Sequence, residues 1–215
     1  MLSTLPAPAQ HELRETAHEQ EVARGDVIYR ELAQPRYSFL ILVVTGRLRT
    51  FVSSPGGRRV ATRYPRPGDL VGLTTVINDG AAAGCDCLTN GVVLRLDPVT
   101  FRRLAKTEPG VGWAAAKAVI SDISSVGSVR VPNMFGSVRV RVAWHLAELM
   151  TPTPDGRMVV HMSQQELAES VGSVREVVAR VLAGLRSEGV LARDSRDIVV
   201  IDPDRLREAA ETIDG

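Results

Sequence analysis

The segment SQQELAESVGSVREVVARVL, which begins at Ser163, constrains the fold of this chain more than any other stretch. Ser163 precedes Glu166 by three positions, and Ser173 precedes Glu176 by the same interval. Each pair matches a capping box, in which the serine hydroxyl accepts from a helix amide and the glutamate accepts from the serine amide. Gly172, between the two predicted helix starts, can adopt the positive φ that a tight inter-helix turn requires. The segment therefore predicts a helix-turn-helix.

The second predicted helix has one apolar and one polar face. At about 100° per residue, its valines and leucines at positions 174, 177, 178, 181, 182 and 185 fall on one side. Arg175, Glu176 and Arg180 fall on the other side, close to the N-terminus. Arginine can bond guanine O6 and N7 together, and glutamate can accept from cytosine N4. An ordinary amphipathic helix with a solvated charged face is the alternative, but two helix starts around a glycine favour a DNA-reading helix.

The same segment resembles the helix-turn-helix of the cyclic-AMP receptor protein/FNR (CRP/FNR) family of bacterial transcription regulators. The matching residues are Gln165, Glu166, Val171, Gly172, Arg175, Glu176 and Arg180. The resemblance implies that Arg175, Glu176 and Arg180 read a half-site similar to TGTGA. It also implies a homodimer that binds double-stranded DNA as a palindromic site, with RNA polymerase as a further partner.

The resemblance further implies contacts to DNA phosphates from Ser163 and Gln165. The family often carries a serine directly before the reading arginine, whereas this chain has a valine there. Ser173, one position earlier, is the candidate replacement for that contact.

A wing is predicted after the second helix. Residues 189–191 and 198–201 are rich in β-branched and apolar side chains and flank the polar sequence ARDSRD, which is typical of a two-stranded hairpin. Arg193 and Arg196 at its tip are candidate phosphate contacts, with exposed turn residues as the alternative. A last amphipathic helix is expected from about Pro203 to Ala210.

The N-terminal part has the texture of many short strands. The runs EVARGDVIY, YSFLILVVTGRLRTFV, RRVATRY and CLTNGVVLRL are separated by Gly- and Pro-containing turns, which predicts a closed β-roll or barrel. The turns in RGDVIY, TGRLR and PGDLVGL resemble those of the family's sensor domain. The resemblance thus implies an α+β chain: a cyclic-nucleotide-binding-like β-roll over 1–108, a dimerisation helix and hinge over 109–132, and a winged helix-turn-helix over 133–215.

The helix expected after Pro109 carries a heptad-like apolar seam. Its members are Gly112, Ala116, Val119, Ile123 and Val126, which step by four, three, four and three. A core stripe against the barrel is the alternative; we favour a dimer seam because helix-turn-helix proteins commonly bind two-fold sites as dimers. Val131-Pro132 ends the helix and sets the expected domain boundary.

The expected effector pocket departs from the cyclic-AMP-binding members of the family. In those members a Glu, an Arg and a Ser hold the ribose and the phosphate. When the segment GDLVGLTTVINDGAAAGCDC is aligned with the family on Gly72 and Gly80, the Glu, Arg and Ser positions are Leu73, Ala83 and Gly84, respectively. No arginine occurs between positions 66 and 95, so a cyclic phosphate would lack a bidentate cation unless Arg58, Arg59 or Arg63 replaced it. The pocket is expected at Gly72, Leu73, Thr74, Ala83 and Gly84, without cyclic AMP of the usual kind.

Other cofactors are also disfavoured. An FNR-like iron–sulfur cluster needs several N-terminal cysteines, which the chain lacks, and no histidine lies between residues 19 and 144 to hold haem. The two cysteines, Cys85 and Cys87, would point the same way on a strand. They are either a small buried pair or a thiol redox or nitric-oxide switch. An apolar ligand and a constitutively competent dimer remain further alternatives.

Composition excludes several other classes of protein. The net charge of +1 gives no global nucleic-acid signature, so the DNA prediction depends on pattern. No apolar run is long enough for a membrane span, and the first residues lack the pattern of a secretory signal. With only two cysteines, we expect a cytoplasmic protein. No metal-ligand spacing, P-loop or nucleophile elbow predicts an enzyme. The rival hypothesis is a small-molecule or redox receptor whose helix-turn-helix mediates protein contacts.

Overall fold

The computed structural model describes residues 5–31, 40–53, 59–78, 83–121, 136–192 and 198–211. The chain divides into two compact units. The first unit comprises Met1–Val52 and Arg63–Val126, and the second comprises Ser53–Thr62 and Gly127–Gly215. The predicted break at residues 131–132 lies outside the described ranges.

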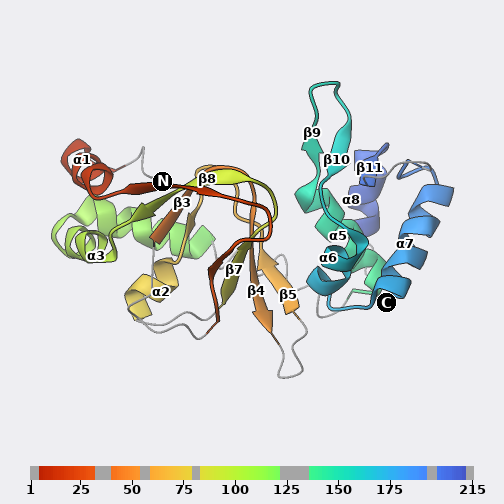
Figure 1. Cartoon of the computed structure of the whole chain (residues 1–215), viewed down its shortest axis with the longest axis horizontal. Helices are drawn as coiled ribbons and strands as arrows, with labels where there is room; N and C mark the ends of the chain where they lie inside the picture. Colours follow the sequence, from red (N-terminus) through yellow and green to blue (C-terminus); the bar gives the residue numbers. More distant parts are fainter. Residues whose placement is uncertain are drawn as a thin grey trace. The chain divides into compact units, whose positions relative to one another are not determined.

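The strands between His18 and Leu96 form two four-stranded sheets rather than one closed barrel (Figure 1). One sheet has the order β1-β8-β3-β6, and the other has the order β2-β7-β4-β5. The strand bounds are β1 His18–Val22, β2 Val27–Tyr29, β3 Leu40–Thr45, β4 Leu48–Ser53, β5 Arg59–Arg63, β6 Leu70–Val71, β7 Gly84–Cys87 and β8 Gly91–Leu96. The run CLTNGVVLRL, which was predicted to be strand-like, is therefore divided by a turn between β7 and β8.

A core of β-branched, aromatic and sulfur-containing side chains fills the space between these strands. Its buried members are Val22, Tyr29, Ile41, Val43, Leu48, Val71, Cys85, Cys87 and Val93. They come from β1, β2, β3, β4, β6, β7 and β8, so this cluster joins both sheets. Removing their apolar surface from water favours a roll over isolated hairpins.

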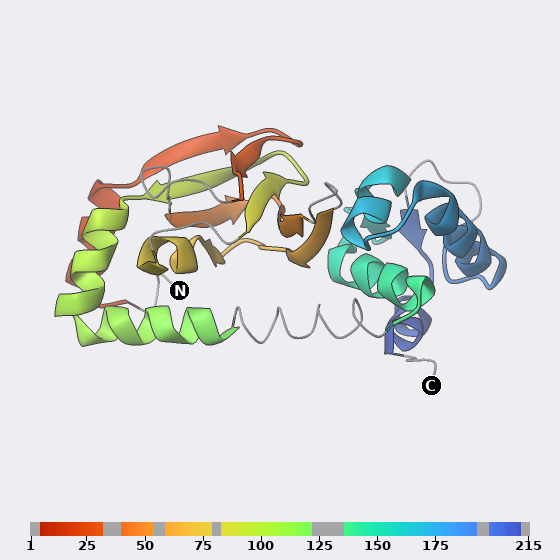
Figure 2. The ribbon, with the colours of Figure 1, turned by 90° about the horizontal axis from the view of Figure 1, so that it is seen from below.

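Helices close one end of the roll. α1 Ala7–Glu15 packs against α3 Pro98–Thr107, and α2 Leu73–Asn78 also contacts α3. Asp97 caps α3, because its carboxylate accepts from the Thr100 amide at 2.7 Å. The chain is helical again at residues 109–121, and this helix runs along the strands in Figure 2. These helices share a second apolar core with β3, β6 and β8, around Phe101 and Leu13.

The second unit is a small helical domain with a three-stranded sheet. Its helices are α5 Val138–Leu149, α6 Gln164–Ser170, α7 Arg175–Ser187 and α8 Pro203–Glu211. The fully buried Leu146, Leu167, Leu182 and Leu206 come one from each helix, so the four helices share one core. In Figure 1 the hairpin of β9 (Thr151–Pro152) and β10 (Met158–Val160) extends away from them.

The predicted wing belongs to a larger sheet than expected. β11 Ile198–Val200 pairs with β10 Met158–Val160, and β10 pairs with β9 Thr151–Pro152. The two predicted wing segments do pair: Leu191 forms an antiparallel bridge with Val200, and the Ala192 and Ile201 amides donate to the Val199 and Val190 carbonyls, each at 2.9 Å. The segment TPTPDGR, expected as a loop, turns at Gly156 (φ 79°) and places β10 on the other side of β11, an addition that was not predicted. Arg193 and Arg196 lie outside the described residues.

Within the described ranges, no helix is both long and apolar enough to span a membrane.

Candidate nucleic-acid interface

α6 begins at the capping box that the sequence predicts. The Ser163 hydroxyl accepts from the Glu166 amide at 3.1 Å, and the Glu166 carboxylate accepts from the Ser163 amide at 2.7 Å. Two amides at the helix end are thereby satisfied, and the negative charge of Glu166 lies at the positive end of the helix dipole. The start of the helix-turn-helix is therefore fixed by local chemistry.

The second predicted capping box is absent. α7 begins at Arg175 with Val174 as its N-cap, and no side chain caps it. The reason is the turn: the Ser173 amide donates to the Ala168 carbonyl at 2.8 Å, which holds Ser173 outside the helix. Ser173 therefore ends the turn instead of starting α7, and it is half-buried.

Gly172 makes this turn possible. Its φ is +64°, in the left-handed region that side chains with a Cβ rarely adopt. The Val171 amide donates to Leu167 O at 3.0 Å and the Gly172 amide donates to Glu169 O at 3.1 Å, so the end of α6 is closed by backbone bonds. The predicted role of Gly172 in the inter-helix turn is confirmed.

The exposed face at the start of α7 carries the three predicted reading side chains. Arg175, Glu176 and Arg180 are all exposed. In the described part of the chain their side chains make no recorded hydrogen bond or ion pair. Other exposed arginines of this unit are engaged, as Arg207 is with Asp204 at 2.7 Å. Two guanidiniums and one carboxylate are therefore presented together with their donors and acceptors available.

The opposite face of α7 holds the helix on its neighbours. Val178, Leu182 and Leu185 are fully buried, and α7 contacts both α6 and α5. Val174, assigned to the apolar face in the sequence, is instead 57% exposed, because it is the N-cap residue and lies before the first turn of the helix. At the other end, Glu188 accepts from Arg139 of α5 at 2.6 Å, and this bond lowers the pKa of Glu188. The recognition helix is thus anchored at its C-terminal end and exposed at its N-terminal end.

The predicted phosphate contacts lie around the same helix ends. Ser163 and Gln165 are exposed at the start of α6. The Ser163 oxygen accepts within the cap, yet its hydroxyl proton can still be donated. The Gln165 amide donates to Glu169 at 3.1 Å, so a phosphate would compete with that bond.

The residues predicted to line the effector pocket differ in burial. Leu73 is 1% exposed and belongs to the core with Leu70, Val76 and Leu96. Thr74 is exposed, Ala83 is half-buried, and Gly72 has a positive φ of 97°. Leu73, at the position predicted to match the family's Glu, is therefore part of the apolar core.

Gly84 lies under an aromatic ring that the sequence analysis missed. Phe51 is its cross-strand partner, and a Cβ on Gly84 would lie 2.5 Å from the Phe51 ring. Real Cβ atoms do not approach a neighbour so closely, so the family's serine has no room here. Of the arginines considered as replacements, Arg63 donates to Leu70 O at 3.0 Å and pairs with Asp69 at 3.2 Å. Arg59 is exposed, and Arg58 lies outside the described ranges.

The two cysteines lie on one face of β7, as predicted, and both are free and buried in the core of the roll. Burial raises the pKa of Cys87 to about 12, and it raises the pKa of Cys85 still further from its ordinary value. Between them Asp86 points to the other face and receives two bonds from Arg49, at 3.0 and 2.6 Å. Because the thiolate is the reactive form, this environment favours two inert core residues over a redox switch.

The residues of the predicted dimer seam differ in exposure on the helix at residues 109–121. Val119 is half-buried and packs against the core, whereas Trp113 and Ile120 are 66% and 62% exposed. Ala116 is exposed as predicted, and Gly112 is half-buried. Ile123 and Val126 lie outside the described residues. Two apolar residues seven positions apart are a heptad signal that the sequence analysis passed over.

The packing of this helix on the first unit decides which of its residues are exposed. The buried Val111, Ala114 and Ala115, with the partly buried Ala118, face the core of the first unit. The opposite face carries Trp113, Ala116 and Ile120, which we call the exposed stripe. Val119, predicted as a seam residue, is partly buried against the core of the first unit, so its place in a dimer seam stays a prediction.

Comparisons with known proteins agree with this arrangement. Residues 19–108 match the family described as cyclic nucleotide-binding domain, and residues 140–209 match the Crp-like helix-turn-helix domain. The transcriptional regulator LdrP of Thermus thermophilus is 27% identical over 197 residues, which cover 89% of this chain and 97% of that protein. The cAMP-activated global transcriptional regulator CRP of Escherichia coli is 26% identical over 169 residues, covering 75% of this chain and 80% of that protein.

A solved structure is also similar over almost its whole length. The crystal structure of TTHB099, a CRP-family transcriptional regulator of Thermus thermophilus, matches with a TM-score of 0.74 and 25% identity. The match covers 91% of this chain and 98% of that one. The α+β architecture predicted from the sequence is therefore confirmed. These similar proteins are transcriptional regulators, not enzymes, in agreement with the sequence prediction.

Proposed function

The chain belongs to the CRP/FNR family of transcription regulators and carries its helix-turn-helix DNA-binding domain, and from that premise we propose that it acts as a homodimer on a palindromic site. In this proposal α7 enters the major groove, and Arg175, Glu176 and Arg180 read a half-site similar to TGTGA. The single observation that carries the proposal is the exposed start of α7, where these three side chains are unengaged within the described residues.

The chemistry of the three side chains supports base reading. Each arginine can donate two parallel bonds to guanine O6 and N7, and the carboxylate of Glu176 can accept from cytosine N4. If these side chains were bonded to other residues, breaking those bonds would weaken DNA binding. Among the described residues they have no such bonds to break. Half-sites containing G·C pairs are the expected targets.

Phosphate contacts position the helix without reading sequence. Ser163 and Gln165 are assigned this role at the N-terminus of α6, where helix amides also attract an anion. Ser173 is half-buried and its amide is engaged, so only its hydroxyl is available for the same role. Arg193 and Arg196 are assigned phosphate contacts from the sequence alone.

The homodimer is proposed to form through the exposed stripe Trp113, Ala116 and Ile120. Large apolar side chains that are about two-thirds exposed on one helix face are typical of an interaction surface. A two-fold axis along this helix would bring each stripe against its copy, as isologous interfaces require. RNA polymerase is carried over from the family as a further partner.

The sensor is proposed not to use cyclic AMP in the manner of its relatives, nor haem or an iron–sulfur cluster. A cyclic phosphate placed at the family position would face Leu73 and Gly84, which supply no cation. Burying a charge without compensation costs several kcal/mol. The proposal therefore separates DNA reading, which the chain retains, from the effector chemistry of its cAMP-activated relative.

Fluorescence anisotropy of the purified protein on labelled duplexes tests the proposed function. One duplex carries two inverted TGTGA half-sites, and the control has the same composition in scrambled order. We expect tighter, strongly salt-dependent binding to the first. Arg175→Ala or Arg180→Ala should cost about 1–3 kcal/mol on that duplex only. Arg207→Ala, an exposed arginine of α8, is the matched control and should bind as the parent does.

Equal retention on both duplexes would contradict base reading. Absence of salt-dependent binding to either would favour the rival hypothesis, in which the helix-turn-helix mediates protein contacts.

A further inference from the structure

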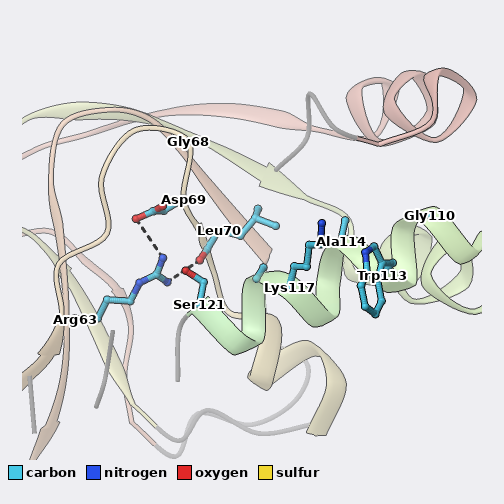
Figure 3. Close-up of a pocket in the computed structure, with 10 residues that line it drawn as sticks. Arg63, Gly68, Asp69, Leu70, Gly110, Trp113, Ala114, Lys117 and Ser121 are labelled. Atoms are coloured by element: carbon cyan, nitrogen blue, oxygen red, sulfur yellow. Dashed lines mark hydrogen bonds and ion pairs between the residues drawn. The ribbon is translucent and has the colours of Figure 1, made fainter. Parts of the chain in front are cut away.

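We propose that the first unit holds a second kind of ligand site, a pocket for a small planar aromatic anion between the β5–β6 turn and the helix at residues 109–121. The pocket has a volume of about 450 Å³. This volume is within the range of about 300–1,000 Å³ that small-molecule sites occupy. Its walls come from two segments of the same unit (Figure 3).

The strand side of the pocket supplies a positioned cation. Arg63, at the end of β5, donates to the Leu70 carbonyl at 3.0 Å and pairs with Asp69 at 3.2 Å. Its side chain is only 14% exposed, so the guanidinium is held in one place. Figure 3 shows it directed toward Leu70 and Ser121 at the strand end of the pocket. A ligand group arriving there meets an ordered donor rather than a mobile one.

The helix side supplies a second cation and an aromatic surface. The Lys117 ammonium lies 5.7 Å from the centroid of the Trp113 ring. In the part of the chain that the structure describes, Lys117 has no recorded carboxylate partner. Trp113 is 66% exposed, and the small side chains of Ala114 and Ala118 leave a shallow apolar floor beside it. A flat ring can cover this floor and contact the indole.

The charges of the lining decide the sign of the ligand. Arg63 and Lys117 are cations, and Asp69 is the one carboxylate among the lining residues. Asp69 is already paired with Arg63, so the lining retains a net positive charge at Lys117. A carboxylate or a similar anion would be attracted, whereas an amine would be repelled. Apolar walls with a few converging polar groups fix both the shape and the charge of the ligand.

This site is distinct from the family's phosphate-binding segment, since none of Gly72, Leu73, Ala83 or Gly84 is among its lining residues. The pocket shares Trp113 with the exposed stripe, so a dimer formed through that stripe would cover part of the indole, whereas Arg63, Lys117, Ala114 and Ala118 lie outside the stripe. The site does not rest on the proposed DNA reading. Binding of a small anion is measured on the protein alone, so the failure of one proposal leaves the other intact.

Isothermal titration of the full-length protein with 2-naphthoate, a planar bicyclic carboxylate, tests the site. 2-Naphthamide, which has the same shape without the charge, is the matched ligand. We expect one site per chain with a Kd on the order of 0.1–1 mM for the carboxylate, as its size allows. We expect the amide to bind about tenfold or more weakly, because it lacks a charge-assisted bond.

The two lysines of the chain provide a matched pair of variants. Lys117→Gln should weaken 2-naphthoate binding about tenfold and leave 2-naphthamide unchanged. Lys106→Gln, on α3 outside the pocket, should leave both ligands unchanged. Both side chains are exposed, so neither change threatens the fold.

Acetylation of the two lysines, read by mass spectrometry, gives an independent readout in the parent protein. Saturating 2-naphthoate should protect Lys117 and leave Lys106 reactive. No detectable binding, equal affinity for the carboxylate and the amide, or equal effects of Lys106→Gln and Lys117→Gln would overturn the proposal.

Discussion

Replacement of Ile120 by glutamate is expected to dissociate the proposed dimer while leaving the first unit folded. Ile120 is 62% exposed and Trp113 is 66% exposed, so both retain apolar surface that only a partner would cover. Fully burying an isoleucine is worth about 1.5–3 kcal/mol, so covering the exposed part of the Ile120 side chain in a dimer contributes roughly 1–2 kcal/mol per copy. Two-fold symmetry doubles it to roughly 2–4 kcal/mol per dimer.

The same estimate fixes the expected size of the effect. Ile120→Ala should weaken dimerisation on the order of 100-fold, and Ile120→Glu should weaken it further because it also places an unpaired charge in an apolar contact. Val99→Glu is the matched control, because Val99 is 70% exposed on α3 and lies outside the exposed stripe. Sedimentation equilibrium measures the dissociation constant, and circular dichroism checks the fold.

Two results would refute the reasoning. A folded Ile120→Glu variant that remains dimeric at parental concentrations would show that the exposed stripe is not the interface. Equal dissociation by Val99→Glu would show that added charge, and not position, is responsible. Val119→Glu separates the observed stripe from the sequence-predicted seam: since Val119 packs against the core, this change should lower the stability of the first unit itself.

Three further predictions concern stability and reactivity. Ser163→Ala should lower the free energy of unfolding of the second unit by about 1 kcal/mol, measured by urea denaturation, whereas Ser173→Ala, which caps nothing, should change it by less than about 0.5 kcal/mol. Gly84→Ser should destabilise the first unit by about 1–3 kcal/mol and should cost much less in a Phe51→Ala background, as a double-mutant cycle would reveal. The two β7 thiols should react slowly with a disulfide reagent at pH 8 until the protein is unfolded. Burial raises the pKa of Cys87 from 9.0 to about 12. The buried, protonated Cys87 thiol therefore contributes stability that is fully present below pH 9.0 and is lost as the pH rises through about 12.

Local signals of the helix-turn-helix could be predicted from the sequence because they join residues three positions apart. The Ser163 capping box is such a signal, and it is present. The second box failed although its spacing was the same. Its serine amide bonds to Ala168, a partner that depends on the path of the turn and not on the serine itself. A cap can therefore be read from spacing only where nothing else competes for its amide.

The two faces of the helix at residues 109–121 show a different limit. Apolar residues that repeat every three or four positions form a stripe along one helix face. Here two neighbouring stripes, one through Val119 and one through Ile120, both contain apolar residues. Which one faces the roll depends on the small side chains Ala114, Ala115 and Ala118, which allow close packing there. That choice is made by tertiary contacts, so periodicity alone could not make it.

The effector region shows a third limit. The replacement of the family's Glu, Arg and Ser by Leu73, Ala83 and Gly84 is a prediction from the sequence. The ring of Phe51 over Gly84 could not be predicted in this way, because it depends on the cross-strand register between β4 and β7. The pocket at Arg63 and Lys117 likewise joins a strand end to a helix that follows it by more than forty positions, and no local pattern marks it.

Selection from a random double-stranded DNA library with the full-length protein tests the central claim most directly. We expect enrichment of a two-fold symmetric sequence whose half-sites resemble TGTGA, with centres separated by about 10–10.5 base pairs or a multiple. We further expect that Arg180→Ala relaxes the preference at one base pair of each half-site while the symmetry persists. Recovery of unenriched sequences, or of an asymmetric site that is unaffected by Arg180→Ala, would contradict the claim that α7 reads DNA.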